Sequence, residues 1–125
     1  MMTVRFELFV RDVGKSVDFY VRALGFSPGK QSEKYSVLRN GNVQIGLGRL
    51  SDLPTDHPLQ LRHADERVGV GVEIVLEVDD VEALYKKVQD FGYPIQDALT
   101  VRPWGLRDFR ICDPDGYYLR ITSKD

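Results

Sequence analysis

The strongest constraint on the fold is a strand-and-helix pattern that occurs twice in the 125 residues. In the first copy, V-R-F-E-L-F-V (residues 4–10) alternates apolar and polar residues as a strand does, and Asp12 follows where a helix N-cap belongs. The second copy begins with E-I-V-L-E-V at 73–78, and Asp79 or Asp80 takes the capping position. A repeat with a period of about 68 residues indicates a fold built by duplication.

Each copy continues into an amphipathic helix. The first helix is predicted to end at Gly25 and the second at Gly92, because glycine tolerates the left-handed conformation that often ends a helix. When the two copies are aligned at these glycines, the second helix is predicted to be one residue shorter than the first. The apolar positions at helical spacing are Val13, Val17, Tyr20 and Leu24 in the first copy, and Val81, Leu84, Tyr85, Val88 and Phe91 in the second.

Two β-hairpins are predicted after the helices. The clearer one lies within 103–121, where Asp113-Pro114-Asp115-Gly116 has the composition of a tight turn between two alternating runs. In the first copy, Asn40-Gly41 predicts a two-residue type I′ turn between strands at 35–39 and 42–47.

Irregular structure is predicted for 28–34, and for 48–68 between the copies, with an additional edge strand at 59–61 considered. Both histidines, His57 and His63, lie in the second of these segments, where solvation is the ordinary state of a loop histidine.

We therefore expect an α+β fold in which each copy supplies a strand, a helix and two further strands. The polar faces of the two sheets are expected to meet around a cleft. The chain is expected to be one domain of two modules, about 1–55 and 69–125, joined by a connection at about 56–68.

Composition excludes several classes of function. The net charge of −2 and the mixture of both signs along the chain disfavour nucleic-acid binding, which needs a basic surface. The chain has no apolar run long enough to span a bilayer and no leader-like N-terminus, so we expect a cytoplasmic protein without a membrane partner. The single cysteine, Cys112, is expected to be a half-buried structural residue.

Three segments carry a family resemblance: V-R-D-V-G-K-S-V-D-F-Y-V-R-A-L-G-F at 10–26, E-V-D-D-V-E-A-L at 77–84, and P-W-G-L-R-D-F-R-I-C-D-P-D-G-Y-Y-L-R-I at 103–121. With them the chain resembles the vicinal oxygen chelate superfamily, which includes glyoxalase I, extradiol dioxygenases, fosfomycin-resistance enzymes and bleomycin-resistance proteins. The resemblance covers nearly the whole chain. It implies two repeated βαβββ modules that form a curved mixed sheet around a cleft.

Enzymes of this superfamily hold one divalent metal with His, Gln or Glu side chains. The resemblance places three of these ligand positions at Arg5, Glu73 and Arg120. The fourth falls on Ile45, or on Gln44 or Gly46 if the hairpin register shifts by one. Arginine stays protonated and has no acceptor for a metal, so we expect no metal, no cofactor and no catalytic residue.

The same positions suggest a ligand site. Arg5, Glu73 and Arg120 are expected to form an ion-pair cluster on facing strands, in which the charges either only balance one another or leave one arginine to bind a carboxylate or phosphate. Trp104 either packs beneath its own loop or stacks on a planar ligand, as aromatic residues of metal-free bleomycin-resistance proteins do. These four are the predicted ligand-binding residues.

The predicted function is that of a metal-independent small-molecule-binding protein of the glyoxalase/bleomycin-resistance type, with a planar or anionic ligand and no catalysis. The alternative is a metal-dependent lyase or dioxygenase of the same superfamily that uses Glu73 with Glu7, His57 or His63. A third interpretation is a structural or regulatory dimer without a ligand. Short chains of this superfamily pair so that both partners complete each cleft, so we expect a homodimer, with or without exchanged modules.

Overall fold

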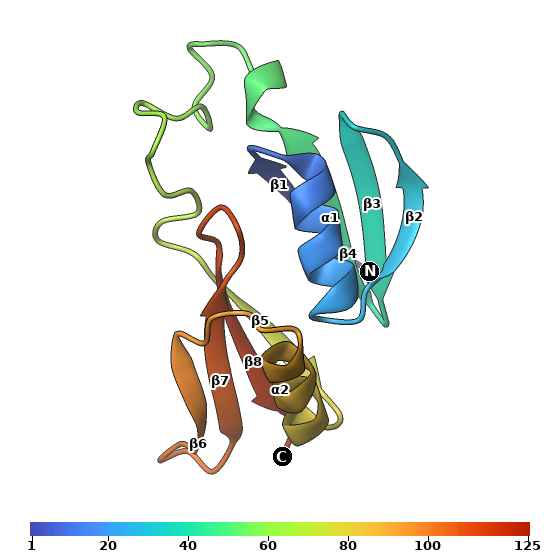
Figure 1. Ribbon diagram of the computed structural model, residues 1–125, viewed down its shortest axis with the longest axis vertical. Helices are drawn as coiled ribbons and strands as arrows, with labels where there is room; N and C mark the ends of the chain where they lie inside the picture. Colours follow the sequence, from blue (N-terminus) through green and yellow to red (C-terminus); the bar gives the residue numbers. More distant parts are fainter. The chain divides into compact units, whose positions relative to one another are not determined.

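The computed structural model describes residues 1–125 and divides into two units, Met1–Glu66 and Arg67–Asp125. Each unit consists of one four-stranded mixed sheet with one α-helix packed on one face (Figure 1). Each unit therefore has the βαβββ order, and the predicted α+β fold is confirmed.

The first unit contains β1 (Phe6–Val10), α1 (Val13–Arg22), β2 (Ser27–Gln31), β3 (Tyr35–Asn40), β4 (Val43–Arg49) and the short 3-10 helix η1 (Leu50–Asp52). Its strand order is β1-β4-β3-β2, with β1 and β4 parallel and the other pairs antiparallel.

The second unit contains β5 (Glu73–Val78), α2 (Val81–Asp90), β6 (Asp97–Val101), β7 (Arg107–Cys112) and β8 (Tyr118–Ser123). Its order, β5-β8-β7-β6, repeats that of the first unit, with β5 and β8 parallel.

Both helices begin at the predicted caps. The Asp12 carboxylate accepts a hydrogen bond from the Lys15 backbone N–H (3.1 Å), and Asp80 accepts one from Ala83 (3.0 Å), so Asp80 rather than Asp79 is the second cap. Each helix has 10 residues. The prediction of a shorter second helix is therefore wrong. The second copy instead has one residue fewer between the end of its helix and the glycine that follows.

Each helix packs on apolar residues of its own sheet. In the first unit Tyr20 is fully buried, with its ring edge-on to Phe19 (4.8 Å between centroids) and Phe26 (5.6 Å). In the second, Tyr85 of α2 meets the fully buried Phe109 of β7 edge-on at 5.0 Å. The first cluster joins α1 to the residue just before β2, whereas the Tyr85–Phe109 contact joins α2 directly to its sheet. Burial of each large apolar side chain contributes about 1.5–3 kcal/mol.

The predicted hairpin at 113–116 is confirmed. β7 and β8 pair in antiparallel register, and Asp113 Oδ1 accepts hydrogen bonds from the backbone N–H groups of Asp115, Gly116 and Tyr117 at 2.9–3.0 Å. Gly116 has a φ of +104°, which an L side chain rarely adopts. The turn is therefore fixed by one carboxylate and one glycine.

The other hairpin differs from its prediction. Asn40 pairs with Val43, so Gly41 and Asn42 form the turn. Gly41 has a φ of +55°, and no residue other than glycine has a positive φ. A type I′ turn needs positive φ at both central residues, so that prediction is wrong.

The residue patterns missed two strands, although the βαβββ modules implied by the family resemblance include them. β2 lies in the predicted loop at 28–34, and β6 lies between the second helix and the hairpin, where no strand was predicted. Both are edge strands with mostly exposed side chains, so they show no apolar alternation.

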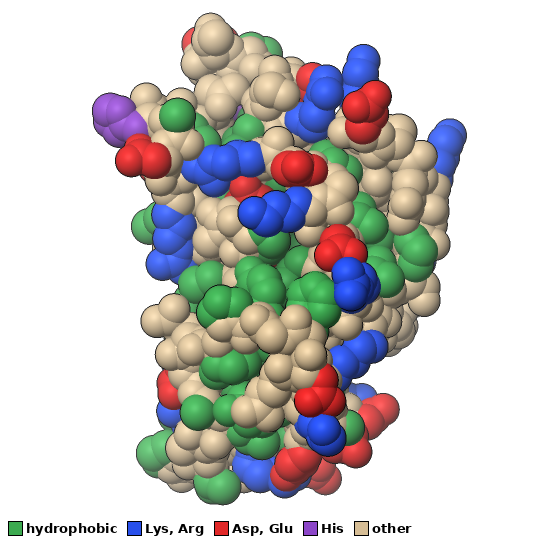
Figure 2. Space-filling view, viewed as in Figure 1, with side chains coloured by type: hydrophobic (Ala, Val, Ile, Leu, Met, Phe, Trp, Pro, Cys, Tyr) green, Lys and Arg blue, Asp and Glu red, His purple; other side chains and the backbone are tan.

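The strand considered at 59–61 is absent. Instead the Gln60 side-chain amide donates hydrogen bonds to the carbonyl oxygens of Leu50 (2.9 Å) and Leu53 (3.2 Å), which ties this segment back as a loop. No helix of the chain is long and apolar enough to cross a lipid bilayer. Side chains of both charges are interspersed on the visible surface (Figure 2), as the small net charge predicts.

Candidate functional site

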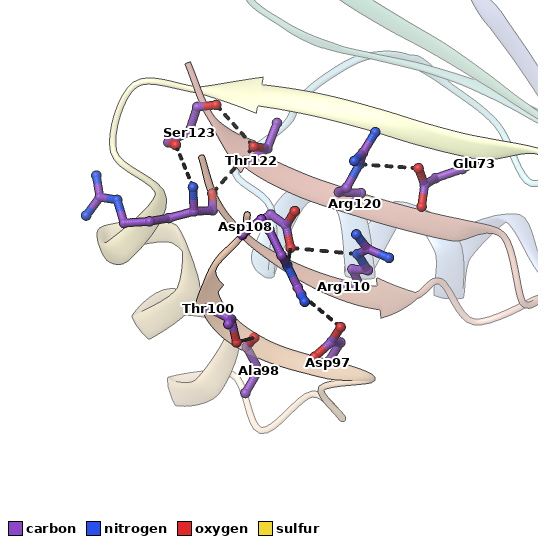
Figure 3. Close-up of polar contacts among 11 residues, drawn as sticks. Glu73, Asp97, Ala98, Thr100, Asp108, Arg110, Arg120, Thr122 and Ser123 are labelled. Atoms are coloured by element: carbon purple, nitrogen blue, oxygen red, sulfur yellow. Dashed lines mark hydrogen bonds and ion pairs between the residues drawn. The ribbon is translucent and has the colours of Figure 1, made fainter. Parts of the chain in front are cut away.

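The face of the second sheet away from α2 carries the predicted site. Strand alternation buries Phe109, Ile111, Leu119 and Ile121 on the helix side. The neighbouring positions on β7 and β8, Asp108, Arg110 and Arg120, are therefore on the opposite face. Figure 3 shows these three side chains together with Glu73 of β5.

The arginines on this face each have a carboxylate partner. Arg120 Nε lies 3.2 Å from Glu73 Oε1, and Arg110 Nε lies 3.7 Å from Asp108 Oδ1. The side chains of Arg120 and Glu73 are 26% and 35% exposed, so this ion pair is partly open to solvent. The predicted pairing of Glu73 with Arg120 is therefore present within the second unit.

Asp108 is the most buried charge of the face, with no exposed surface. Its Oδ1 accepts a hydrogen bond from Arg102 Nε at 2.7 Å, while Oδ2 has no hydrogen-bond partner. Arg102 Nη2 also donates to Asp97 Oδ2 at 2.8 Å. A buried carboxylate is costly without a cation, so Arg102 is the main compensation for Asp108.

A hollow of about 430 Å³ opens beside the Glu73–Arg120 pair. Trp104 is 55% exposed and lines this hollow together with Arg120, so it does not pack beneath its own loop. The hollow thus combines an aromatic surface, aliphatic walls, one guanidinium and one further carboxylate. Its lining residues are Val75, Glu77, Trp104, Leu106, Arg120 and Thr122.

The structure brings three of the four predicted residues into one region: Glu73, Trp104 and Arg120. Arg5 lies in the first unit, where its guanidinium is 3.5 Å from Glu7 and its side chain is 63% exposed. The contribution of Arg5 to a ligand site stays a prediction.

Sequence reasoning did not assign the remaining lining residues. Val75 and Glu77 follow from the alternation of β5, which places them on the same face as Glu73. Leu106 lies in an irregular segment with no periodic signal, and the contacts of Arg102 depend on strand pairing.

The four metal-ligand positions that the family resemblance implies do not suit a metal in this chain. The strand registers identify Gly46 as the fourth position. Gly46 pairs with Glu7 of β1 in the same way that Arg120 pairs with Val75 of β5, whereas Ile45 is buried on the helix side. Gly46 has no side chain, so Glu73 is the one potential ligand among the four, and it is paired with Arg120. The donor set therefore does not fit a divalent ion.

Histidines do not complete such a set within either unit. His57 accepts a hydrogen bond from the Leu59 N–H at Nδ1 (3.0 Å), and His63 is exposed in the same loop region of the first unit. No group of three or more His, Cys, Asp or Glu side chains is arranged to hold a metal ion.

The polar face of the first sheet carries a hydrogen-bonded pair, Tyr35 and Glu7. The Tyr35 hydroxyl donates to the Glu7 carboxylate, at 3.0 Å from either oxygen, above the backbone of Gly46. Burial and the hydrogen bond to Glu7 raise the pKa of Tyr35 above its ordinary value. A Cβ at Gly46 would overlap both side-chain ends, so this glycine makes room for the pair.

The first unit also has a larger hollow, of about 610 Å³, near the start of α1. Two arginines line it, but Arg49 makes two hydrogen bonds to Asp52, at 2.8 and 3.0 Å, and Arg11 donates to the Ala64 carbonyl. It has no tryptophan or other aromatic residue among its lining residues. The smaller hollow of the second unit is therefore the better candidate for an aromatic ligand.

The duplicated βαβββ module and its polar sheet face define the class of protein, the vicinal oxygen chelate fold. Residues 3–121 match the Glyoxalase/Bleomycin resistance protein/Dioxygenase superfamily, and the chain belongs to this superfamily.

A curated relative agrees with this assignment, and solved structures share the fold. The chain is 30% identical over 116 residues to a bleomycin resistance protein of Geobacillus stearothermophilus, covering 85% of this chain and 84% of the relative. A protein of unknown function from Agrobacterium tumefaciens is 25% identical, with a TM-score of 0.77 over 100% of this chain and 95% of that one. A superfamily member from Sphaerobacter thermophilus has 22% identity and a TM-score of 0.73, over 99% and 98% of the two chains.

Proposed function

We propose that this chain is a metal-independent small-molecule-binding protein of the bleomycin-resistance type, and that its ligand lies in the hollow of the second unit. The observation that carries the proposal is the exposed Trp104 beside Arg120 in one hollow. An exposed indole next to a guanidinium can stack on a planar ring and bind an anionic substituent. The similarity to a relative named bleomycin resistance protein supports the same function.

The ligand class follows from the charges. Arg120 is partly exposed and can offer its fork to a carboxylate or phosphate, in competition with Glu73 at 3.2 Å. The aliphatic side chains of Val75 and Leu106 suit the edge of an aromatic ring. We therefore propose a planar ligand that carries one anionic group.

Metal independence is proposed on the chemistry of the donor set. Two of the four metal positions hold arginine and one holds glycine. Two permanent positive charges near a divalent ion would repel it. Metal analysis of the purified, dialysed protein is the test. Stoichiometric zinc, iron, manganese or nickel that is lost in Glu73→Ala would favour a lyase or dioxygenase instead.

Assembly as a homodimer, with or without exchanged modules, is proposed for the whole chain. Each sheet has a regular edge strand, β1 or β5, whose outer side pairs with no other strand of its sheet. Such edges are commonly covered by a second chain, and two-fold symmetry is the usual closure. Light scattering at micromolar concentration checks this, and a monomer with intact ligand binding would contradict it.

Ligand binding itself is tested with a matched pair of compounds. 2-Naphthoate is planar and anionic, whereas 2-naphthol has the same rings and is neutral at pH 7. We expect isothermal calorimetry to show saturable 2-naphthoate binding that is weakened in Arg120→Ala. Equal binding of both compounds, or no change in Arg120→Ala, would contradict the proposed role of Arg120.

A further inference from the structure

Residues 102–106, here called the Trp104 loop, connect β6 to β7 and place Trp104 and Leu106 in the hollow. Two backbone hydrogen bonds close the loop: Arg102 N–H donates to the Leu106 carbonyl (2.8 Å), and Gly105 N–H donates to the Arg102 carbonyl (2.9 Å). Gly105 has a φ of +91°. Arg102 therefore takes part in both bonds that close the loop.

The Arg102 side chain fastens this loop to two strands. Its Nε donates to Asp108 Oδ1 on β7 at 2.7 Å, and its Nη2 donates to Asp97 Oδ2 on β6 at 2.8 Å. The Arg102 side chain is 17% exposed and Asp108 is fully buried. Arg102 therefore bridges the two strands that the Trp104 loop connects.

The geometry of this bridge requires an arginine. Both bonds use different nitrogens of one planar group, which lysine with its single ammonium cannot reproduce. Asp108 has only one other charged neighbour on this face, Arg110 at 3.7 Å. Loss of Arg102 would therefore leave the buried carboxylate with only the longer ion pair to Arg110, and the loop without its side-chain anchor.

We propose that Arg102 is a positioning residue for the ligand site: it acts through Asp97 and Asp108 to hold the Trp104 loop in the orientation that aims the indole into the hollow. Arg102 is absent from the lining of the hollow, so its effect is carried by the loop. The relevance to ligand binding rests on the function proposed above, whereas the effect on Trp104 does not.

Trp104 is the single tryptophan, so intrinsic fluorescence reports on this loop alone. The experiment compares the unliganded full-length protein with Arg102→Lys and Arg102→Ala by acrylamide quenching and fluorescence anisotropy. Far-UV circular dichroism at the same temperature identifies the folded samples. In both variants we expect the quenching constant of Trp104 to rise by about twofold and its anisotropy to fall. These changes are expected because the loop becomes more mobile while the rest of the protein stays folded.

Arg107→Gln is the matched control, because Arg107 stands at the other end of the loop and its side chain pairs with Glu82 of α2 at the surface. It should leave both fluorescence readouts unchanged. If Arg107→Gln changes them as much as Arg102→Ala does, the effect is not specific to Arg102 and the proposal is overturned. Unchanged quenching and anisotropy in folded Arg102→Ala would overturn it as well.

A double variant keeps the test decisive if the single variants fail to fold. Arg102→Leu combined with Asp108→Leu removes both partners of the buried pair, a change that proteins often tolerate. We expect this double variant to fold with a mobile Trp104, and a Trp104 as immobile as in the unaltered protein would overturn the proposal. Because these measurements use no ligand, failure of 2-naphthoate binding would count against the proposed function alone.

Discussion

Arg110 of β7 and Arg120 of β8 are directly paired across the antiparallel ladder, so two guanidinium groups leave the same face of the sheet side by side. Like charges in this position repel one another unless each is compensated. Here Glu73 compensates Arg120 at 3.2 Å, whereas Arg110, at 3.7 Å, shares Asp108 with Arg102. Charge balance on this face therefore depends on the Glu73–Arg120 pair, which borders the hollow, and on the group in which Arg102 and Arg110 share Asp108.

Glu73→Gln should make Arg120 more available to an anionic ligand. The substitution removes the carboxylate that competes at 3.2 Å, so we expect 2-naphthoate to bind about fivefold more tightly, or ~1 kcal/mol, the typical worth of a partly exposed pair. Thermal stability should fall slightly, because Arg110 and Arg120 then repel one another. Calorimetry checks the affinity. Weaker 2-naphthoate binding, or an equal gain for 2-naphthol, would contradict the role of Glu73.

Trp104→Ala should weaken binding of both naphthalene compounds, because it removes the surface on which the rings stack. The expected loss is about 1–3 kcal/mol. Val101→Ala is the control, since Val101 is similarly exposed on the neighbouring strand β6 but does not line the hollow. An equal effect of the two substitutions would show that the loss has no connection with the hollow.

Gly46→Ala should disturb the pair above it. The new Cβ overlaps the Glu7 carboxylate and the Tyr35 hydroxyl, which must move apart. We expect a loss of about 1 kcal/mol of unfolding free energy for the broken hydrogen bond. The pKa of Tyr35 should move down toward its ordinary value, which ultraviolet titration measures. Gly14→Ala in α1 is the control, because its Cβ meets only an ordinary contact and alanine favours the helix.

Alkaline pH should destabilise the protein through Tyr93. Burial, followed by the negative charges of Asp113 and Cys112, raises the pKa of Tyr93 in the folded state above the ordinary value of 10.0. The folded state therefore keeps this proton longer than the unfolded chain does, and the associated stability is present below pH 10 and lost as pH rises above it.

Urea unfolding at pH 8 and above pH 10 measures this effect. Tyr93→Phe should lose about 1 kcal/mol at pH 8, because the hydroxyl donates to the Cys112 carbonyl at 2.7 Å, but should show a smaller further loss at high pH. Tyr35, whose pKa is also raised, accounts for part of the remaining slope. An identical pH dependence of the two proteins would exclude Tyr93 as its source.

Local chemistry made much of the fold predictable. Asp12, Asp80 and the turn at 113–116 act through hydrogen bonds to residues within four positions, so a single sequence contains the whole signal. Glu73 and Arg120 were predictable because the repeat and the family resemblance together placed them on one polar face.

Features that depend on distant residues were not predictable. β2 and β6 have mostly exposed side chains and no strand pattern of their own; the family resemblance implied strands in this number, but only pairing with β3 and β7 locates them. The choice of Gly46 over Ile45 needed the register of β1 with β4. The role proposed for Arg102 needed Asp97 and Asp108, which strand pairing brings together.

The two strands that the residue patterns missed also leave each sheet with one irregular edge and one regular edge. β2 and β6 each contain a register shift, between Pro28 and Gln31 and between Asp97 and Thr100, and Pro28 has no N–H to donate. β1 and β5, at the opposite edges, pair without interruption. An incoming strand therefore finds a regular hydrogen-bonding edge on only one side of each sheet, so strand addition in continuous register is confined to β1 and β5.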